Sequence, residues 1–169
     1  MGKHTNGATQ RPLGILRDPV HLLAFGFGAG LSPRAPGTVG TVIAVPVAFG
    51  LALLPPWWRA AVIALMFAAG IALCGTSARR LGVHDHSGIV WDEIVGYLIA
   101  VAVAVAIAPF NWITLGAAFV LFRIFDILKP WPIGWLDRRV GGGFGIMVDD
   151  ALAGIYAGVI WLIISLWIR

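Results

Sequence analysis

The chain has 169 residues, of which 59% are hydrophobic and 12% charged, and its mean hydropathy is +0.89. Soluble domains usually carry about 25% charged residues, so this composition excludes an ordinary soluble protein and predicts an integral membrane protein. The formal charge is +4. No basic run alternates with aromatic residues, which argues against nucleic acid as a partner and favours attraction to anionic lipid headgroups. We expect residues 1–169 to form one all-α membrane domain.

The N-terminal region is predicted to lie outside the membrane. Residues 1–18 are polar and lack the short apolar core and cleavage site of a signal peptide, so we expect a mobile tail and no cleavable leader. Residues 19–31 are apolar but short and rich in glycine. They predict a short interfacial or re-entrant helix rather than a span.

The first two predicted spans are uncharged runs of residues 35–58 and 60–78. A helix that crosses a bilayer needs about 20 mostly apolar residues, which both runs provide. Pro55 and Pro56 predict the turn between them.

Three further spans are predicted in the C-terminal half. Residues 94–122 are uncharged but too long for one ordinary span, and Pro109 breaks them near the middle. We therefore predict one helix from Trp91 to this break and another from the break to Leu128. Residues 151–168 form the last span, which gives a helical bundle of four to five membrane segments.

These spans divide the charges unequally. The loops 55–59 and 109–112 fall on one side, whereas the tail, residues 78–93 and residues 129–150 fall on the other. Ten of the twelve cations lie on this second side, which the positive-inside rule makes cytoplasmic. All eight carboxylates also lie there, although they were not used in the assignment. They are Asp18, Asp85, Asp92, Glu93, Asp126, Asp137, Asp149 and Asp150.

The first cluster of reactive side chains is residues 84–93. Asp92 and Glu93 stand where the third predicted span begins, and the dipole of a helix N-terminus by itself favours an acid there. Two adjacent carboxylates with further ligands upstream also suit Mg²⁺, whereas a zinc site would lack a third typical ligand. Proton transfer and simple loop hydrogen bonding both stay open for the upstream residues. These are His84, Asp85 and His86.

The second cluster lies at the inner end of the fourth predicted span. Arg123, Asp126 and Lys129 are spaced by three residues, so successive members are neighbours on one helix face. A salt-bridge ladder would explain the pairing. Ionisable groups within a membrane span more often belong to a functional site than to a structural ion pair. We therefore expect Arg123 and Lys129 to hold phosphate oxygens and Asp126 to be a metal ligand or nucleophile. Pro130 and Pro132 predict the end of this helix.

The third cluster is residues 141–150, where a glycine run precedes two adjacent acids. The run is not a Walker motif and predicts a flexible loop. Asp149 or Asp150 could cap the last helix, but a cap requires one residue, and two neighbouring carboxylates repel unless a cation bridges them. The pair therefore favours a metal site.

A fourth stretch, residues 28–40, contains hydrogen-bond donors among glycines and prolines. Ser32, Arg34 and Thr38 could hold an anionic headgroup beneath this stretch. A plain turn before a helix is the better explanation of any one of them.

Together these stretches resemble the phosphatidylglycerophosphatase A family, a group of bacterial lipid phosphatases. Residues 30–40, 83–93, 122–133 and 142–150 carry the resemblance, in the order that the family has them. The resemblance implies Mg²⁺-dependent removal of the terminal phosphate from phosphatidylglycerophosphate, giving phosphatidylglycerol. It also implies a multi-pass protein of the bacterial inner membrane, with its active site on the cytoplasmic side.

We expect Mg²⁺ to be the cofactor, held by some of five acids, and to activate a water that attacks phosphorus. The acids are Asp92, Glu93, Asp126, Asp149 and Asp150. An aspartyl-phosphate formed on Asp126 is the mechanistic alternative. A cation or proton transporter would place acids near the bilayer midplane and repeat its halves. A phosphatidyltransferase would need an Asp-Gly-x-x-Ala-Arg signature, which the sequence lacks.

Overall fold

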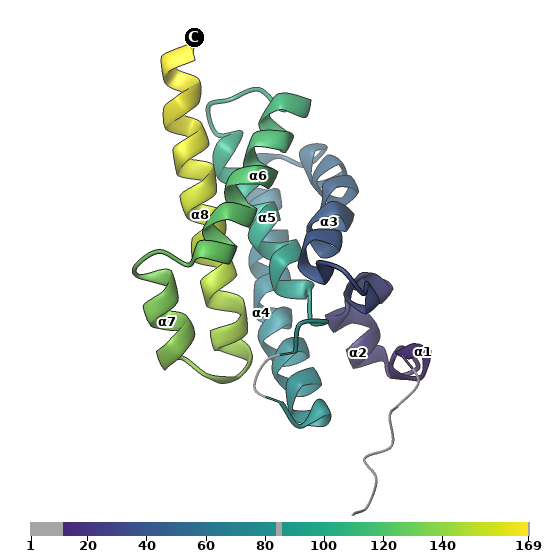
Figure 1. The fold of residues 1–169 in the computed structure, drawn as a ribbon. Coiled ribbons are helices and arrows are strands. Elements are labelled where there is room, and N and C mark those ends of the chain that lie inside the picture. The colour runs from purple at the N-terminus through teal and green to yellow at the C-terminus, as the bar shows by residue number, and fades with distance from the viewer. Residues whose placement is uncertain (1–11, 84–85, 169) are drawn as a thin grey trace, which may run out of the picture.

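Helices account for every regular element in the described part of the chain (Figure 1). The structure is a computed structural model, and it describes residues 12–83 and 86–168. The predicted all-α class is confirmed. The helices are α1 (Pro12–Ile15), α2 (Pro19–Ala24), the 3₁₀ helix η1 (Gly26–Leu31), α3 (Pro36–Ala52), α4 (Pro56–Leu81), α5 (Trp91–Ala104), α6 (Trp112–Leu128), α7 (Ile133–Arg139) and α8 (Gly142–Ile168).

Two of these helices are long and apolar enough to cross a membrane. α4 has 26 residues and α8 has 27, with mean hydropathies of 2.0 and 2.2 in their most apolar windows. α3, α5 and α6 have 17, 14 and 17 residues, fewer than the roughly 20 that a span needs. α4 and α8 agree with an integral membrane protein, whereas the number of four to five spans stays a prediction.

The turn between α3 and α4 lies earlier than the charges suggested. α3 ends at Ala52, and α4 begins at Pro56 instead of after Arg59. Proline suits the first turn of a helix because its missing N–H would have no helical partner there. The Arg59 side chain reaches back from α4 and donates to the carbonyl oxygens of Leu51 and Leu54, both at 3.3 Å. A charged side chain therefore caps α3 rather than separating two spans.

α5 is the central helix, and it packs against α3, α4, α6 and α8. It begins at Trp91 as predicted, but it ends at Ala104, before Pro109. None of its side chains is exposed, and Tyr97 is fully buried, with its hydroxyl donating to the carbonyl of Leu115 at 3.2 Å. The two acids in its first turn therefore face the interior of the bundle instead of its surface.

Glycines allow α5 and α8 to approach closely. A Cβ atom at Gly96 would lie 2.6 Å from the Phe122 ring and 2.7 Å from the carbonyl oxygen of Asp150. A Cβ at Gly154 would collide with the carbonyl of Gly96. Small residues permit such close contacts between membrane helices, and here the contact sets the acids of α8 beside those of α5.

The predicted glycine loop before the last span is wrong, because α8 already begins at Gly142 and includes every glycine of the run except Gly141. A Cβ at Gly143 would collide with the carbonyl of Ile71 on α4. This packing against α4 outweighs the low helix propensity of glycine. Asp149 and Asp150 consequently lie two turns inside the helix, so the alternative that either caps its N-terminus is also wrong.

The connections of the bundle gather at two ends (Figure 1). The α3–α4 and α5–α6 connections lie near the C-terminus, whereas α1, α2 and α7 lie at the opposite end. This division is the one predicted from the charges. At the second end, α2 is fixed to α4 by a buried hydrogen bond of 2.8 Å between His21 Nδ1 and Ser77 Oγ. α2 and η1 have six residues each, as expected of a segment that does not span.

Candidate active site

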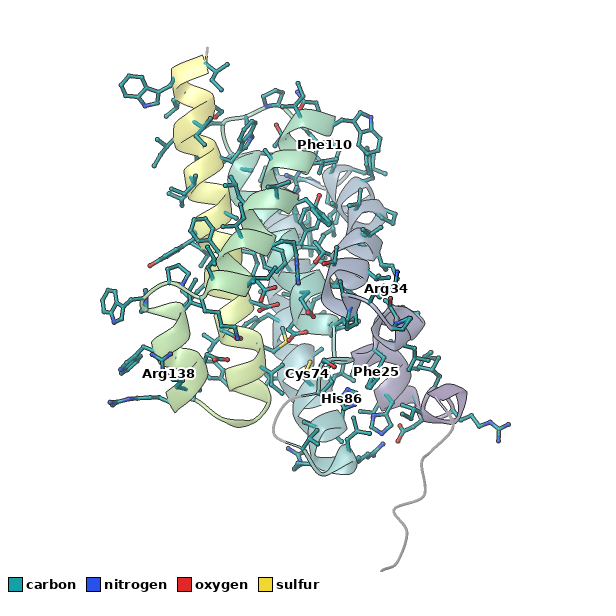
Figure 2. All side chains as sticks on the ribbon, viewed as in Figure 1. Phe25, Arg34, Cys74, His86, Phe110 and Arg138 are labelled. Atoms are coloured by element: carbon teal, nitrogen blue, oxygen red, sulfur yellow. The ribbon has the colours of Figure 1, made fainter. Side chains whose placement is uncertain are left out.

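A polar pocket of about 250 Å³ lies among α5, α6, α7 and α8. Six of the seven carboxylates that the structure describes line it, together with Lys129, His86 and Ser87. Figure 2 shows that His86 lies toward the end of the bundle that holds Phe25 and Arg138, opposite Phe110. The carboxylates are Asp92, Glu93, Asp126, Asp137, Asp149 and Asp150. We call this cavity the acidic pocket.

Three of these acids converge closely enough to share one metal ion. Asp92, Glu93 and Asp150 each offer an oxygen, and these oxygens all lie within 4.8 Å of one another. Asp150 is only 3% exposed. Two buried oxygens, Glu93 Oε2 and Asp150 Oδ2, accept no hydrogen bond from the described residues. Like charges this close repel unless a cation or proton joins them, and an all-oxygen donor set fits Mg²⁺ better than zinc.

Arg123 lies at one edge of these acids. Its Nη1 is 2.7 Å from Asp126 Oδ2 and 3.9 Å from Glu93 Oε1. Arg123 and Asp126 are therefore paired along α6, as their spacing predicted. The guanidinium balances part of the negative charge at the edge of the acidic pocket and keeps donors available for an anion.

Lys129 departs from the predicted ladder. α6 ends at Leu128, and Lys129 follows in the left-handed conformation with φ 42°. Its side chain crosses to two other helices, where Nζ donates to Asp137 Oδ1 at 2.6 Å and to Asp149 Oδ2 at 2.5 Å. The expectation that it would continue the face of Arg123 and Asp126 fails because the backbone turns at the helix end.

These contacts keep Lys129 charged. Burial alone would lower the pKa of Lys129, but the hydrogen bonds with Asp137 and Asp149 outweigh it and raise this pKa. The hydrogen bond from Lys129 in turn lowers the pKa of Asp137, against a smaller opposing effect of burial. Asp137 was counted among the inner carboxylates but was not predicted as a site residue. Pro130 and Pro132 predicted only that the helix ends before Asp137.

His86 lines the acidic pocket beside the start of α5. Its Nδ1 accepts a hydrogen bond from the backbone N–H of Gly88 at 2.9 Å. A neutral ring in this arrangement carries its proton on Nε2. His84 and Asp85, the other predicted proton carriers, lie outside the described residues.

The structure places the three hydrogen-bond donors predicted to hold a headgroup, Ser32, Arg34 and Thr38, in different surroundings. Ser32 Oγ donates to the carbonyl of Arg34 at 2.8 Å, which is the local turn that we considered as their alternative role. Neither residue is among the described residues that line the acidic pocket. Thr38, in the first turn of α3, instead lines a neighbouring apolar groove together with Arg123.

Gly37 supports the acids in a way that the sequence did not indicate. A Cβ atom at this position would collide with Glu93 Oε1 and would lie 3.1 Å from Arg123 Nη1. The backbone of α3 therefore covers the contact between these two side chains. Only a residue without a Cβ leaves both of them in place.

The chain is similar to one family model and to curated proteins over most of its length. The model of the phosphatidylglycerophosphatase A family matches residues 22–165. The phosphatidylglycerophosphatase A of Escherichia coli (strain K12) is 45% identical over 153 residues, which cover 90% of this chain and 87% of that protein. The protein of the same name from Haemophilus influenzae is 47% identical over 156 residues, which cover 90% of this chain and 92% of that protein. No solved structure matches the chain.

The family model matches most of the chain, and the two relatives are 45% and 47% identical to it. Both findings agree with the acidic pocket and the apolar helices. The chain belongs to the phosphatidylglycerophosphatase A family and is a phosphatase that hydrolyses phosphoric monoesters.

Proposed function

We propose that the protein hydrolyses the terminal phosphomonoester of phosphatidylglycerophosphate, giving phosphatidylglycerol and inorganic phosphate. The names of the two relatives support this substrate. The observation that carries the proposal is the acidic pocket, where buried carboxylate oxygens without a described partner lie beside helices long enough to cross a membrane. A lipid phosphate with its chains in the bilayer could reach such a pocket.

The residues fit Mg²⁺ as the cofactor, with Asp92, Glu93 and Asp150 as its ligands. Asp126 and Asp149 line the same pocket and are further candidates. When bound, Mg²⁺ supplies a Lewis acid that offsets the charge of the phosphate. A bound cation would also offset the repulsion between these closely spaced carboxylates, which explains why they lie together.

Two cations of the chain bind the anionic substrate. Lys129 stays charged between Asp137 and Asp149, and Arg123 keeps donors near the acidic pocket. A fixed cation beside the reacting phosphate stabilises the charge that develops on the transferring phosphoryl group, and a second cation holds another anionic group of the substrate. The Nε2–H of His86 donates a hydrogen bond to the leaving oxygen in this proposal, and His84 and Asp85 remain candidates for passing the proton.

Asp126 is less suited to act as the nucleophile. Its Oδ2 is paired with Arg123 at 2.7 Å, and such a pair stabilises the carboxylate where it is. We therefore favour attack by water over an aspartyl-phosphate. Rapid quenching during turnover tests this choice, because labelled phosphate bound covalently to the protein would establish the aspartyl-phosphate instead.

The proposed location is the bacterial inner membrane, with the acidic pocket on the cytoplasmic side. The excess of cations predicted for the same end of the bundle supports this orientation.

Phosphate release from purified protein in detergent tests the substrate. Phosphatidylglycerophosphate should be hydrolysed with a kcat/KM at least about tenfold above that of phosphatidic acid, a lipid monoester without the second glycerol. Equal rates for both lipids, or no release from phosphatidylglycerophosphate, would contradict the proposed substrate.

A further inference from the structure

An apolar groove adjoins the acidic pocket on the outer side of α6. It has an open volume of about 410 Å³. We call it the α6 groove, and the residues that define it here are Thr38, Val120, Arg123, Ile124 and Ile127.

The floor of the α6 groove is a stripe of exposed aliphatic side chains. Val120, Ile124 and Ile127 are 56%, 42% and 68% exposed, and their spacing of four and three residues places them on one helix face. Exposed apolar surface of this kind marks contact with lipid or with a partner. Its chemistry fits a hydrocarbon chain.

Arg123 connects the α6 groove to the acidic pocket. The same side chain lines the groove and lies 2.7 Å from Asp126, which lines the pocket. Asp126 pairs with one nitrogen of this guanidinium, but the buried Arg123 Nε donates to no described residue, so a second anion can meet it. The hydroxyl-bearing Thr38 lies at the same groove, so this end of the groove is suited to a phosphate with a hydrocarbon tail.

The two cations are spaced along α6 in the order that the lipid requires. Lys129 lies just past the end of α6 and faces Asp149 in the acidic pocket, whereas Arg123 lies within α6 and lines the groove. The proposed substrate has a terminal phosphomonoester and, one glycerol away, a phosphodiester that carries the diacylglycerol. Lys129 at the first and Arg123 at the second would direct the acyl chains onto Ile124 and Val120.

We infer that the α6 groove binds the diacylglycerol part of the substrate, with Arg123 at the phosphodiester. This inference rests on the proposed function. It assigns the groove to the substrate rather than to the bulk membrane lipid that contacts every outward helix face. The difference is testable, because a substrate site affects hydrolysis and is competed by substrate.

The first test fills the groove. Ile124→Trp is compared with the wild type and with Leu65→Trp, which enlarges a side chain that is 70% exposed on α4, away from the groove. For each protein, kcat/KM is measured for dioleoyl and dihexanoyl phosphatidylglycerophosphate in the same detergent. We expect Ile124→Trp to reduce the long-chain to short-chain ratio at least about fivefold and Leu65→Trp to leave it within twofold. Equal ratios in all three proteins would overturn the inference.

The second test does not depend on turnover or on a variant that folds. A phosphatidylglycerophosphate with a photoreactive group in its acyl chain is irradiated with the wild-type protein, and the labelled residues are mapped by mass spectrometry. Label should concentrate in residues 119–128 and fall when excess unlabelled substrate is added. Label spread evenly over α4, α6 and α8, unchanged by competition, would overturn the inference. Phosphate release by the wild type tests the proposed function separately, so that either can fail without the other.

Discussion

Lys129 Nζ lies 2.5 Å from Asp149 Oδ2 although twenty residues separate them in the chain. This contact joins the end of α6 to the interior of α8, and Asp137 of α7 accepts from the same nitrogen at 2.6 Å. One cation therefore holds together three helices around the acidic pocket. It also places a positive charge beside the acids that we propose bind metal.

Replacing Lys129 should impair hydrolysis. A hydrogen bond to a charged group contributes about 1.5–3 kcal/mol, which corresponds to roughly ten- to hundredfold in kcat/KM. We expect a loss of this size for Lys129→Met, measured as phosphate release. Arg138→Met is the matched control, because Arg138 is exposed on α7 and is not among the described residues that line the pocket. Equal activity of the two variants would remove Lys129 from the phosphate site.

The ion pair between Lys129 and Asp137 should stabilise the protein over a defined pH range. The pKa of Asp137 is lowered in the folded protein, so its contribution is present above the unfolded pKa of about 3.9 and is lost as pH falls through the folded value. The pKa of Lys129 is raised, so its contribution is present below the unfolded pKa of about 10.4 and is lost as pH rises through the folded value.

Thermal unfolding of the wild type and of Asp137→Asn measures this contribution. The difference in Tm should be constant between about pH 5 and pH 9 and should shrink below about pH 4. A difference that grows on acidification would show that Asp137 is not held as the charged partner of Lys129.

Gly37 should not tolerate even one added carbon. Its Cβ would collide with Glu93 Oε1 and crowd Arg123, and a displacement of about 1 Å at a catalytic group can cost on the order of 100-fold in rate. We expect a loss of that order in kcat for Gly37→Ala. Gly50→Ala in the same helix is the control, because no atom lies within 4 Å of its added Cβ. Should both variants keep wild-type kcat, the contact of α3 with Glu93 would have no role in positioning.

The buried hydrogen bond between His21 and Ser77 should contribute to stability alone. Ser77→Ala leaves a ring nitrogen of a residue only 7% exposed without its partner, which costs about 1–3 kcal/mol. Denaturant unfolding in detergent should show this loss. Thr76→Ala, which removes only an exposed hydrogen bond with Arg79, should change stability by less than about 0.5 kcal/mol. Equal unfolding of both variants would show that α2 is not held by this bond.

The sequence predicted much of the site because charge in a membrane protein is costly and therefore positioned. Asp92 and Glu93 were expected at a helix start and lie in the first turn of α5. The topology also predicted one end of the bundle for all the acids, and six of the seven described carboxylates share one pocket there. These predictions used only the lengths of apolar runs and the positions of charges.

Long-range packing set the features that the sequence did not indicate. Glycines 141–143 suggested a loop, but contact with α4 places Gly143 in α8. The spacing of Lys129 suggested a partner in α6, yet the left-handed backbone at that residue directs its side chain to α7 and α8. Gly37 has no local pattern that predicts Glu93 as its neighbour. Each feature depends on residues distant in sequence, which local periodicity does not report.

The dependence of phosphate release on Mg²⁺ tests the central claim most directly. The substrate is phosphatidylglycerophosphate, and divalent metal is first removed from the protein with a chelator. The wild type is compared with Asp150→Asn and Asp18→Asn. Asp18 is the control, because it pairs with Arg80 and caps α2 outside the acidic pocket.

We predict that the wild type and Asp18→Asn are inactive after chelation and recover fully with Mg²⁺. Asp150→Asn should stay at least about 100-fold below them at every Mg²⁺ concentration. Full activity of the chelated wild type, or a wild-type response of Asp150→Asn to Mg²⁺, would contradict a metal-dependent phosphatase site built on these acids.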